Sequence, residues 1–209
     1  MSKYIGASCK LCRREGEKLF LKGDRCNTTK CAIIKRNTPP GFRKVTTRAR
    51  LTAYGQQLRA KQRVRRMYGV LEDQFYIFFE RAVNQAGDTG ENFLKLLEKR
   101  LDNVVYRAMF AKSRVTARQA VSHGHILING KKVTIPSYIV KVGDVITIKE
   151  RSAKSVLFSD LAAHVRKETI PGWLSVDGAT LEIKVVSDAD VKEYYEPLNI
   201  KLVIEYYSR

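Results

Sequence analysis

The sequence predicts an α+β protein: a cysteine-containing N-terminal segment and a helical domain, followed by a domain in which helices pack on a mixed, mainly antiparallel β-sheet. Three observations predict it. All four cysteines fall between residues 9 and 31, apolar residues recur at helical spacing from 51 to 110, and short alternating runs follow after 125. We expect a metal-binding extension and basic linker over 1–45, a helical domain over 46–98 and an α/β domain over 99–198.

Positive charge is concentrated in the first third of the chain. The 209 residues carry 39 Lys and Arg against 21 Asp and Glu, net +18, and residues 1–66 alone hold 19 against 3, net +16. So much like charge repels itself unless a polyanion neutralises it, so nucleic acid is the leading partner and an acidic membrane surface the second. No apolar run approaches the roughly 20 residues of a membrane span, and the N-terminus has no apolar signal segment. We expect a soluble, cytoplasmic protein.

The four cysteines form a cluster with the spacing C-x2-C-x13-C-x4-C. They are Cys9, Cys12, Cys26 and Cys31. This spacing lets four thiolates converge tetrahedrally on a cation, and the few apolar residues nearby leave a role for a metal in folding. One structural Zn²⁺ is the first interpretation, and an iron–sulfur cluster or unmetallated cysteines are the alternatives. Four protein ligands leave no open position for catalysis.

Basic side chains lie between the cysteines and continue into a loop and a helix. Asn37–Gly41 breaks any helix because its two prolines lack a donor and disfavour helical geometry before them. From Ala32 to Leu71 there is no acid, which favours nucleic-acid contact over a solvated tail or a membrane role. The candidate contacts in this part are Arg13, Arg14, Lys22, Arg36, Arg43, Lys44, Arg48, Arg50, Arg59, Lys61, Arg63 and Arg66.

Three helices are predicted in the middle of the chain, over 51–68, 73–85 and about 88–110. The second carries an aromatic stripe at helical spacing, which we interpret as core, with base stacking as the alternative. Asp88 and Glu91 resemble a capping box at the start of the third helix. These helices supply the core of the helical domain.

A short helix, two strands and a third strand follow. Ser113 is placed to cap the helix, and Gly124 to end it in the left-handed conformation. Residues 125–133 predict strand, Asn-Gly turn and strand, because Asn-Gly tolerates the positive φ of a type I′ hairpin turn. A Gly-Asp turn then leads into a half-buried strand at 145–148.

This arrangement places cations on two neighbouring elements. Arg114 and Arg118 share one face of the short helix, and Lys131 and Lys132 follow the hairpin tip. Such a set can bracket a phosphate backbone, to which the helix N-terminus adds its amides. The alternative is an ordinary αβ fragment whose cations are solvated.

The last third of the chain is nearly neutral and predicts scaffold more than RNA contact. Its expected elements are a helix over 157–165 and strands over 173–176, 181–186 and 200–206. Trp173 is expected to fill the core, with partner contact as the alternative.

Three segments resemble the S4 RNA-binding domain: Arg100–Arg107, Ser113–Gln119 and Gly124–Gly130. With the cysteine spacing, the Pro-Pro-Gly linker, the helical segment and the terminal Leu202–Arg209, the whole chain resembles the bacterial ribosomal protein S4 family, in its cysteine-containing zinc-binding form. The resemblance implies an S4 module at about 99–165. It also implies that the tail, 199–209, packs on the helical domain with its two tyrosines partly buried.

The resemblance implies a structural constituent of the small ribosomal subunit in the cytoplasm, without a small-molecule substrate. It would bind a multi-helix junction of 16S rRNA as a primary binder, nucleate assembly of the subunit body and contribute to translational accuracy. Ribosomal proteins S5 and S12 and mRNA at the entry channel are the implied neighbours, and some members repress their own operon. The RNA-facing part of the motif falls on Ser113, Arg114, Thr116, Arg118, Gln119, His123, Lys131 and Lys132.

An enzyme is the main alternative class, because S4 modules also occur in pseudouridine synthases, whose catalytic Asp follows Gly-Arg-Leu. Here Lys99 replaces that glycine before Arg100-Leu-Asp102, and the rest of the chain is too short for that family's catalytic domain. No phosphate-binding P-loop or nucleophilic constellation is present, so we expect no enzyme and no catalytic residue. A zinc-dependent DNA-binding regulator is the third interpretation.

Overall fold

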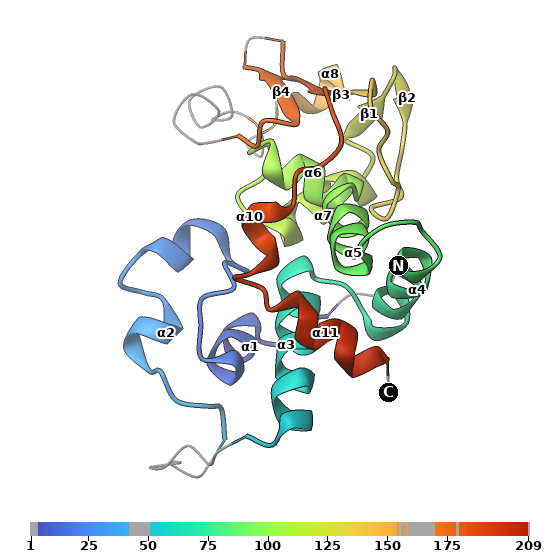
Figure 1. Ribbon diagram of the computed structural model, residues 1–209. Helices are drawn as coiled ribbons and strands as arrows, with labels where there is room; N and C mark the ends of the chain where they lie inside the picture. The colour runs from blue at the N-terminus through green and yellow to red at the C-terminus, as the bar shows by residue number, and fades with distance from the viewer. Residues whose placement is uncertain are drawn as a thin grey trace. The chain divides into compact units, whose positions relative to one another are not determined.

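The computed structural model describes residues 4–41, 51–153, 155, 158, 170–178 and 180–208. The chain divides into two compact units, Met1–Phe93 with Lys192–Arg209 and Leu94–Val191 (Figure 1). The predicted linker contacts Arg43, Lys44, Arg48 and Arg50 lie outside the described residues, as does the predicted helix over 157–165 apart from one position. None of the helices in the described ranges is both long and apolar enough to cross a membrane.

The first unit begins with three short helical elements, α1 (Ser8–Glu15), the 3₁₀ helix η1 (Gly23–Asn27) and α2 (Ala32–Lys35). Gly16 ends α1 with a φ of 79°, a left-handed conformation that glycine adopts without strain. The small core of this segment consists of Cys12, Leu19 and Leu21, with Leu11, Ile33 and Met67 packed against it. Because Met67 belongs to α3, the cysteine segment is attached to the helical part of the same unit.

The two predicted helices after the linker are confirmed as α3 (Ala53–Tyr68) and α4 (Glu72–Val83). Thr52 caps α3, its hydroxyl oxygen accepting from the N–H of Gly55. The aromatic stripe of α4 is core, as predicted. Its members Phe75, Phe78 and Phe79 are buried.

The third predicted helix is wrong in its length, because it is two helices, α5 (Thr89–Glu98) and α6 (Leu101–Arg107). Asp88 caps α5 as expected, accepting from the N–H of Glu91 at 2.8 Å. Between the helices, Arg100 forms an antiparallel bridge with Ile139, and the N–H of Leu101 donates to the carbonyl of Tyr138. In a continuous helix these backbone groups would pair within the helix, but here they pair with residues 138 and 139. This is a tertiary contact, which the spacing of apolar residues does not reveal.

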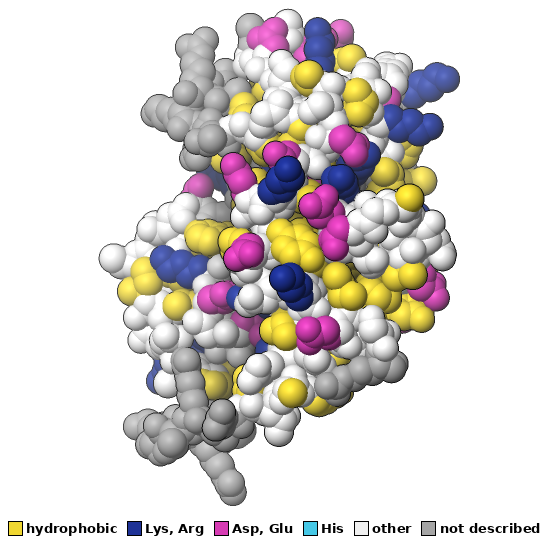
Figure 2. All heavy atoms as spheres, in the orientation of Figure 1, with side chains coloured by type: hydrophobic (Ala, Val, Ile, Leu, Met, Phe, Trp, Pro, Cys, Tyr) yellow, Lys and Arg dark blue, Asp and Glu magenta, His cyan; other side chains and the backbone are white. Residues whose placement is uncertain are grey.

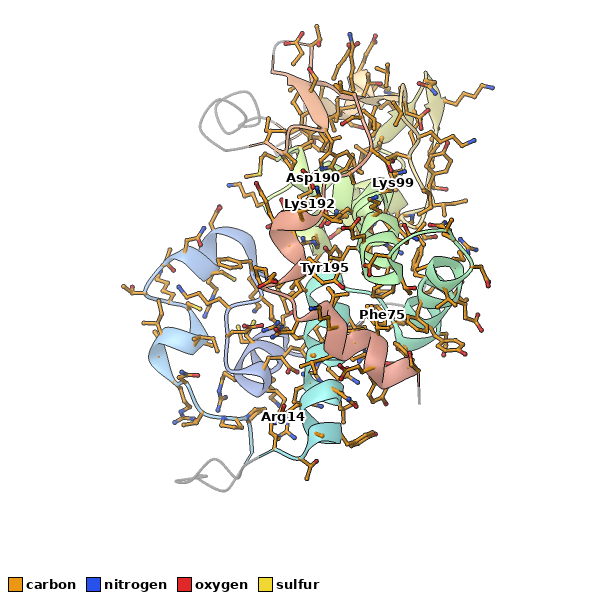
Figure 3. All side chains as sticks on the ribbon, in the orientation of Figure 1. Arg14, Phe75, Lys99, Asp190, Lys192 and Tyr195 are labelled. Carbon is orange, nitrogen blue, oxygen red and sulfur yellow. The ribbon has the colours of Figure 1, made fainter. Side chains whose placement is uncertain are left out.

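The C-terminal strand predicted over 200–206 is wrong, because this segment is the helix α11 (Ile200–Tyr207), preceded by α10 (Lys192–Tyr195). Its apolar residues recur three and four apart, and this period outweighs the β-propensity of Ile, Val and Tyr. α11 packs on α3, and both terminal tyrosines are half-buried, as the resemblance implied. The ring centroid of Phe75, a residue of α4 labelled in Figure 3, lies 6.3 Å from that of Tyr207.

A hydrogen-bonded cluster holds the end of α11. The Tyr207 hydroxyl donates to a Glu72 carboxylate oxygen at 2.8 Å, and the Lys61 ammonium donates to the same oxygen. Burial disfavours the Glu72 carboxylate, but these two bonds and the charges of Lys61 and Arg65 together outweigh it and hold the pKa of Glu72 below its ordinary value. Burial and the neighbouring carboxylate raise the pKa of Tyr207.

The second unit packs α6 and α7 (Arg114–Ser122) with a five-stranded sheet in the order β2-β1-β3-β5-β4. The strands are β1 (Ile126–Ile128), β2 (Lys131–Lys132), β3 (Val145–Ile148), β4 (Leu174–Asp177) and β5 (Glu182–Val185), with the short helix α8 (Glu150–Ala153) after β3. Every described strand pair is antiparallel, so the expectation of a mixed sheet is wrong. Asn129 and Gly130 both have positive φ in the predicted hairpin turn, and Trp173 is 2% exposed, which confirms it as core.

Removing core contacts of α11 should destabilise the first unit. Ile200 is fully buried, so Ile200→Ala should lower the free energy of unfolding by about 3 kcal/mol. The exposed neighbour Lys201→Ala should change it by less than about 0.5 kcal/mol. Urea unfolding followed by far-UV circular dichroism measures both variants, and equal effects would contradict the packing of this helix.

Candidate nucleic-acid interface and cysteine cluster

Three short elements bring the four cysteines to one place in the first unit. Cys9 and Cys12 lie in α1, Cys26 lies in η1, and Cys31 directly precedes α2. All four line one cavity of about 20 Å³. The spacing that suggested a cluster is therefore realised as a common cavity.

The buried Cys12 thiol is affected by the other three cysteines of the cluster. Burial raises the pKa of the Cys12 thiol, a backbone hydrogen bond at Leu19 opposes the shift, and the other three cysteines raise it further. The backbone N–H of Lys22 contacts the Cys26 sulfur at 3.4 Å. All four cysteines are free thiols. Thiolates so close together would be stabilised by a cation between them.

The donor chemistry of the cavity fits a soft or borderline metal ion, because four thiolates are a preferred ligand set of Zn²⁺. Lys22 and Arg25 also line the cavity, where their charges would offset those of the thiolates. Within the described ranges, however, no three His, Cys, Asp or Glu side chains converge into a ready-made metal site.

The basic face of α3 contacts an acidic residue of the cysteine segment. Glu15, whose side chain is 2% exposed, accepts from Arg59 at 3.3 Å and from Arg66. Burial raises the pKa of Glu15 even though Arg66, Arg59 and Arg14 all favour its charged form. The same burial lowers the pKa of Arg66. These two arginines join the segment to α3.

Two other cations of α3 also have partners inside the first unit. Arg63 donates to Glu17 and, at 2.6 Å, to the carbonyl of Pro197. Lys61 is 4% exposed, and its ammonium pairs with Glu72 at 2.5 Å. The assignment of Lys61 to an RNA-facing surface does not agree with this burial, because an ammonium inside the unit cannot reach a phosphate.

The remaining cations of the cysteine segment divide into bound and exposed ones. Arg13 donates from Nε to the carbonyl of Thr38 at 2.9 Å and from Nη2 to that of Pro39, so it holds the loop. Among the predicted RNA contacts of this segment, Arg14, which is labelled in Figure 3, Lys22 and Arg36 are exposed. On the face drawn in Figure 2, Lys and Arg side chains lie among Asp and Glu side chains rather than in one continuous basic patch.

The second unit positions its candidate residues through the cap of α7. The Ser113 hydroxyl oxygen accepts from the N–H of Thr116 at 3.2 Å, as predicted, and lies 2.9 Å from the Thr116 hydroxyl. Ser113 is 4% exposed. Its hydroxyl caps the start of α7 and is buried, so the predicted RNA contact of Ser113 has no exposed side chain to support it.

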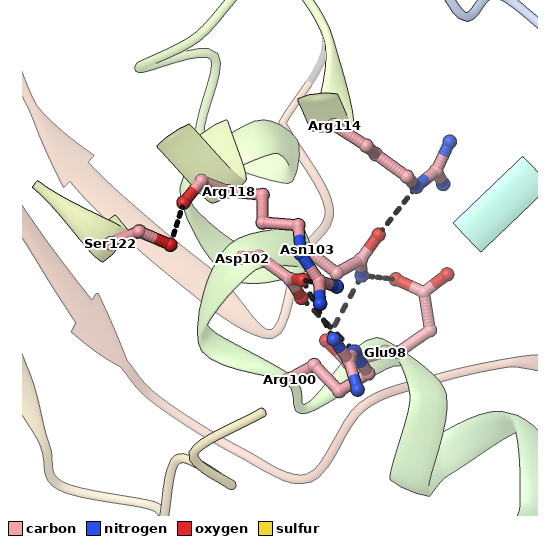
Figure 4. A network of polar contacts seen from close by, with 7 residues as sticks. All are labelled: Glu98, Arg100, Asp102, Asn103, Arg114, Arg118 and Ser122. Carbon is pink, nitrogen blue, oxygen red and sulfur yellow. Dashed lines mark hydrogen bonds and ion pairs between the residues drawn. The ribbon is translucent and has the colours of Figure 1, made fainter. Parts of the chain in front are cut away.

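Arg114 contacts two groups on α6, of which Figure 4 shows the first, Asn103. Its Nε donates to Oδ1 of Asn103 at 2.8 Å, and its guanidinium carbon lies 4.5 Å from the centroid of the Tyr106 ring. Both Asn103 and Tyr106 belong to α6, so this helix determines where the Arg114 side chain points.

Arg118, one turn further along α7, contacts a carboxylate. Its Nη1 donates to Oδ2 of Asp102 at 3.3 Å. Asp102 also accepts two hydrogen bonds from the buried Arg100, at 3.0 and 2.7 Å (Figure 4). Burial lowers the pKa of Arg118, and the attraction of Asp102 opposes the shift. Arg118 thus closes a buried ion network.

A second buried carboxylate lies beside this network. Glu98 is fully buried and accepts two hydrogen bonds from Arg107, at 2.9 and 2.7 Å. One of its oxygens also accepts from Nδ2 of Asn103 at 2.7 Å. The Asn103 amide, which contacts Arg114, is therefore held in place by the ion pair of Glu98 and Arg107.

Exposed polar side chains lie along α7 and on β2. They are Gln119, His123, Lys131 and Lys132. Gly124 follows α7 with a φ of 73°, and a Cβ at this position would meet the side chain of Lys132. The lysine therefore lies over the end of α7, beside the other exposed residues of this group.

Comparisons with known proteins agree with this geometry. Residues 3–98 match the family described as Ribosomal protein S4/S9 N-terminal domain, and residues 99–146 match the S4 domain. The chain is 51% identical to small ribosomal subunit protein uS4A of Alkaliphilus metalliredigens, 52% to uS4 of Halothermothrix orenii and 53% to uS4 of Clostridioides difficile, over the full length of both chains in each case. The chain belongs to the uS4 family.

The uS4 family is structural rather than enzymatic, and the geometry of Asp102 agrees. In a pseudouridine synthase the Asp of this context would face a substrate, whereas here it is 3% exposed and occupied by Arg100 and Arg118. The apparent enzyme motif is thus part of the buried network of a uS4-family protein.

Sequence reasoning missed the residues that hold the arginines of this uS4-family chain. They are Glu98, Asp102, Asn103 and Tyr106. A signal was present, because Asp102 and Asn103 interrupt an otherwise apolar run with polar groups. Polar residues inside a buried face usually have hydrogen-bond partners.

The ion pairs of Glu15 should stabilise the first unit more than exposed pairs do. Glu15→Ala leaves Arg59 and Arg66 without this carboxylate, and we expect a loss of about 2 kcal/mol, below the value for fully buried pairs because the arginines are partly exposed. Glu17→Ala, at a side chain 40% exposed, should cost less than about 1 kcal/mol. Urea titration by circular dichroism compares them, and a larger loss at Glu17 would reject this ranking.

Proposed function

We propose that this chain is a structural constituent of the bacterial small ribosomal subunit, in the cytoplasm, and binds 16S rRNA there. The observation that carries the proposal is an identity of 51–53%, over the whole length of both chains, to proteins named small ribosomal subunit protein uS4 or uS4A. The match to the S4 domain at residues 99–146 covers α7 and the hairpin, where the exposed polar residues lie. These are the elements that we assign to RNA contact.

The RNA interface that we propose is smaller than the sequence suggested. In the second unit it consists of Arg114, Thr116, Gln119, His123, Lys131 and Lys132, with Arg118 as a partly exposed neighbour. Among the described residues of the first unit it consists of the exposed Arg14, Lys22 and Arg36. The linker residues Arg43, Lys44, Arg48 and Arg50, which lie outside the described residues, stay part of the proposal. Lys61 and Ser113 are left out because they are buried, and Arg13, Arg59, Arg63 and Arg66 act first as internal partners.

The mechanism we propose is electrostatic attachment followed by recognition of RNA shape. Each phosphate contact releases counterions, so affinity should fall steeply with salt. The deep major groove of A-form RNA admits few side chains, so a helix and a hairpin tip would read the shape of a multi-helix junction. Joining several RNA helices in this way would make the protein a primary binder that nucleates assembly of the subunit body.

Further roles rest on the family resemblance alone. We propose ribosomal proteins S5 and S12 and mRNA at the entry channel as neighbours, a contribution to translational accuracy, and autogenous translational repression. The nearly neutral surface expected beyond residue 150 is compatible with protein contact. A DNA-binding regulator has no observation in its favour and becomes one outcome of the test below.

A matched pair of lysines on one sheet tests the RNA interface. Lys131 on β2 and Lys184 on β5 are both exposed. In filter binding to C. difficile 16S rRNA, Lys131→Glu should weaken affinity and reduce the slope of log affinity against log salt by about 1, whereas Lys184→Glu should change little. Equal losses would refute this interface, and preference for duplex DNA over rRNA would favour the DNA-binding regulator.

We also propose that Cys9, Cys12, Cys26 and Cys31 hold one structural Zn²⁺. The support is that all four line one cavity and that the pKa of Cys12 is raised by burial and by the other three cysteines. Bound zinc would stabilise the thiolates and tie α1, η1 and α2 together. An iron–sulfur cluster on the same ligands is the alternative.

Elemental analysis of the purified chain tests this site. We expect about one zinc per chain, with loss of the metal and of unfolding free energy in Cys12→Ser. Ser8→Ala is the control, because Ser8 lines the same cavity without offering a thiol. Iron with sulfide would indicate the cluster instead, and a metal-free chain would refute both.

A further inference from the structure

The sequence presents Arg114 and Arg118 as equivalent, but their surroundings differ. Arg118 donates to a carboxylate, that of Asp102, which also accepts from the buried Arg100. The contacts of Arg114 on α6 are a neutral amide and a neutral ring. The two arginines are therefore oriented by different chemistry, and this difference has consequences for how each can meet an anion.

The amide of Asn103 is held in one orientation. Its Nδ2 donates to the carbonyl of Glu98 at 3.0 Å and to the Glu98 carboxylate at 2.7 Å. Because both amide protons have acceptors, turning the amide over would lose two hydrogen bonds inside the unit. Oδ1 of Asn103 is thus directed outward, and it accepts from Nε of Arg114 at 2.8 Å.

The ring of Tyr106 restrains the guanidinium in a second way. The guanidinium carbon of Arg114 lies 4.5 Å from the ring centroid, within the range of a cation–π contact. The bond to Asn103 sets the direction of the side chain, and the ring limits the movement of the guanidinium. Together they order the Arg114 side chain before RNA binds. The entropy cost of fixing its rotamer is then not added to the cost of binding RNA.

We propose that Asn103 and Tyr106 are positioning residues that hold Arg114 in the orientation in which it contacts rRNA phosphate. The inference rests on the proposed RNA-binding function and adds to it two residues that do not themselves touch RNA. It also separates the two arginines, because Arg118 completes the buried network around Asp102 and stabilises the fold. Preordering an arginine in this way increases affinity without adding a contact.

Variants of Tyr106 test the proposal in the full-length chain, with C. difficile 16S rRNA as the probe. Tyr106→Phe keeps the ring and should bind within about twofold of the original chain, whereas Tyr106→Leu removes the ring and should bind about fivefold more weakly. Asn103→Leu should weaken binding about tenfold, if circular dichroism shows it folded. Val115→Ala, at an exposed neighbour of Arg114, should leave binding unchanged.

A double-mutant cycle separates positioning from general loss of structure. In an Arg114→Ala background, Tyr106→Leu should weaken binding no further, because the group that it positions is absent. The same fivefold loss in both backgrounds would overturn the proposal. Tyr106 is only half-buried, so this variant decides the matter even where Asn103→Leu does not fold.

The cycle also distinguishes this inference from the proposed function. If the unsubstituted chain binds the rRNA with steep salt dependence but the cycle shows no coupling, only the positioning role fails. If the unsubstituted chain does not bind the rRNA at all, both proposals fail together.

Discussion

Two buried carboxylates organise the second unit. Glu98 and Asp102 lie on consecutive helices and accept hydrogen bonds from Arg107 and Arg100 respectively. An isolated buried charge is costly, so the groups around each carboxylate must supply hydrogen bonds and positive charge to it. The position of α7 relative to α6 follows from this requirement. Arg118 of α7 donates to Asp102, and Asn103 of α6 connects Glu98 to Arg114 of α7.

The same constraint changes the meaning of the positive charge in the first unit. A net charge of +16 over residues 1–66 suggested a continuous basic surface. The three acids in that stretch include Glu15 and Glu17, and both contact arginines of α3. Part of the excess charge is therefore used to attach the cysteine segment to the helices. Neighbouring arginines on a helix do not all have to face the same partner, even in a strongly basic protein.

The sequence predicted most elements and much of the candidate site, but by local signals only. Apolar spacing located α3 and α4, Ser113 and the Asn-Gly turn located α7 and the hairpin, and the cysteine spacing located the cavity. The helix α11 was missed because the β-propensity of Ile, Val and Tyr was given more weight than their spacing of three and four. The break between α5 and α6 was missed because it depends on pairing with residues 138–140, which is a tertiary contact. Partners of the cations were missed for the same reason, since spacing shows a charge but not what it contacts.

The glycine after α7 leaves room for a lysine at the end of the helix. With no side chain at Gly124, the far end of the Lys132 side chain lies against the backbone that ends α7. A Cβ at this position would push the Lys132 ammonium away from the helix end, while the flexible side chain would absorb the movement and leave the hairpin in place. The larger cost of a substitution would be backbone strain, because the φ of 73° suits glycine and few other residues. One glycine therefore both ends the helix and lets a cation of the neighbouring strand rest over that end.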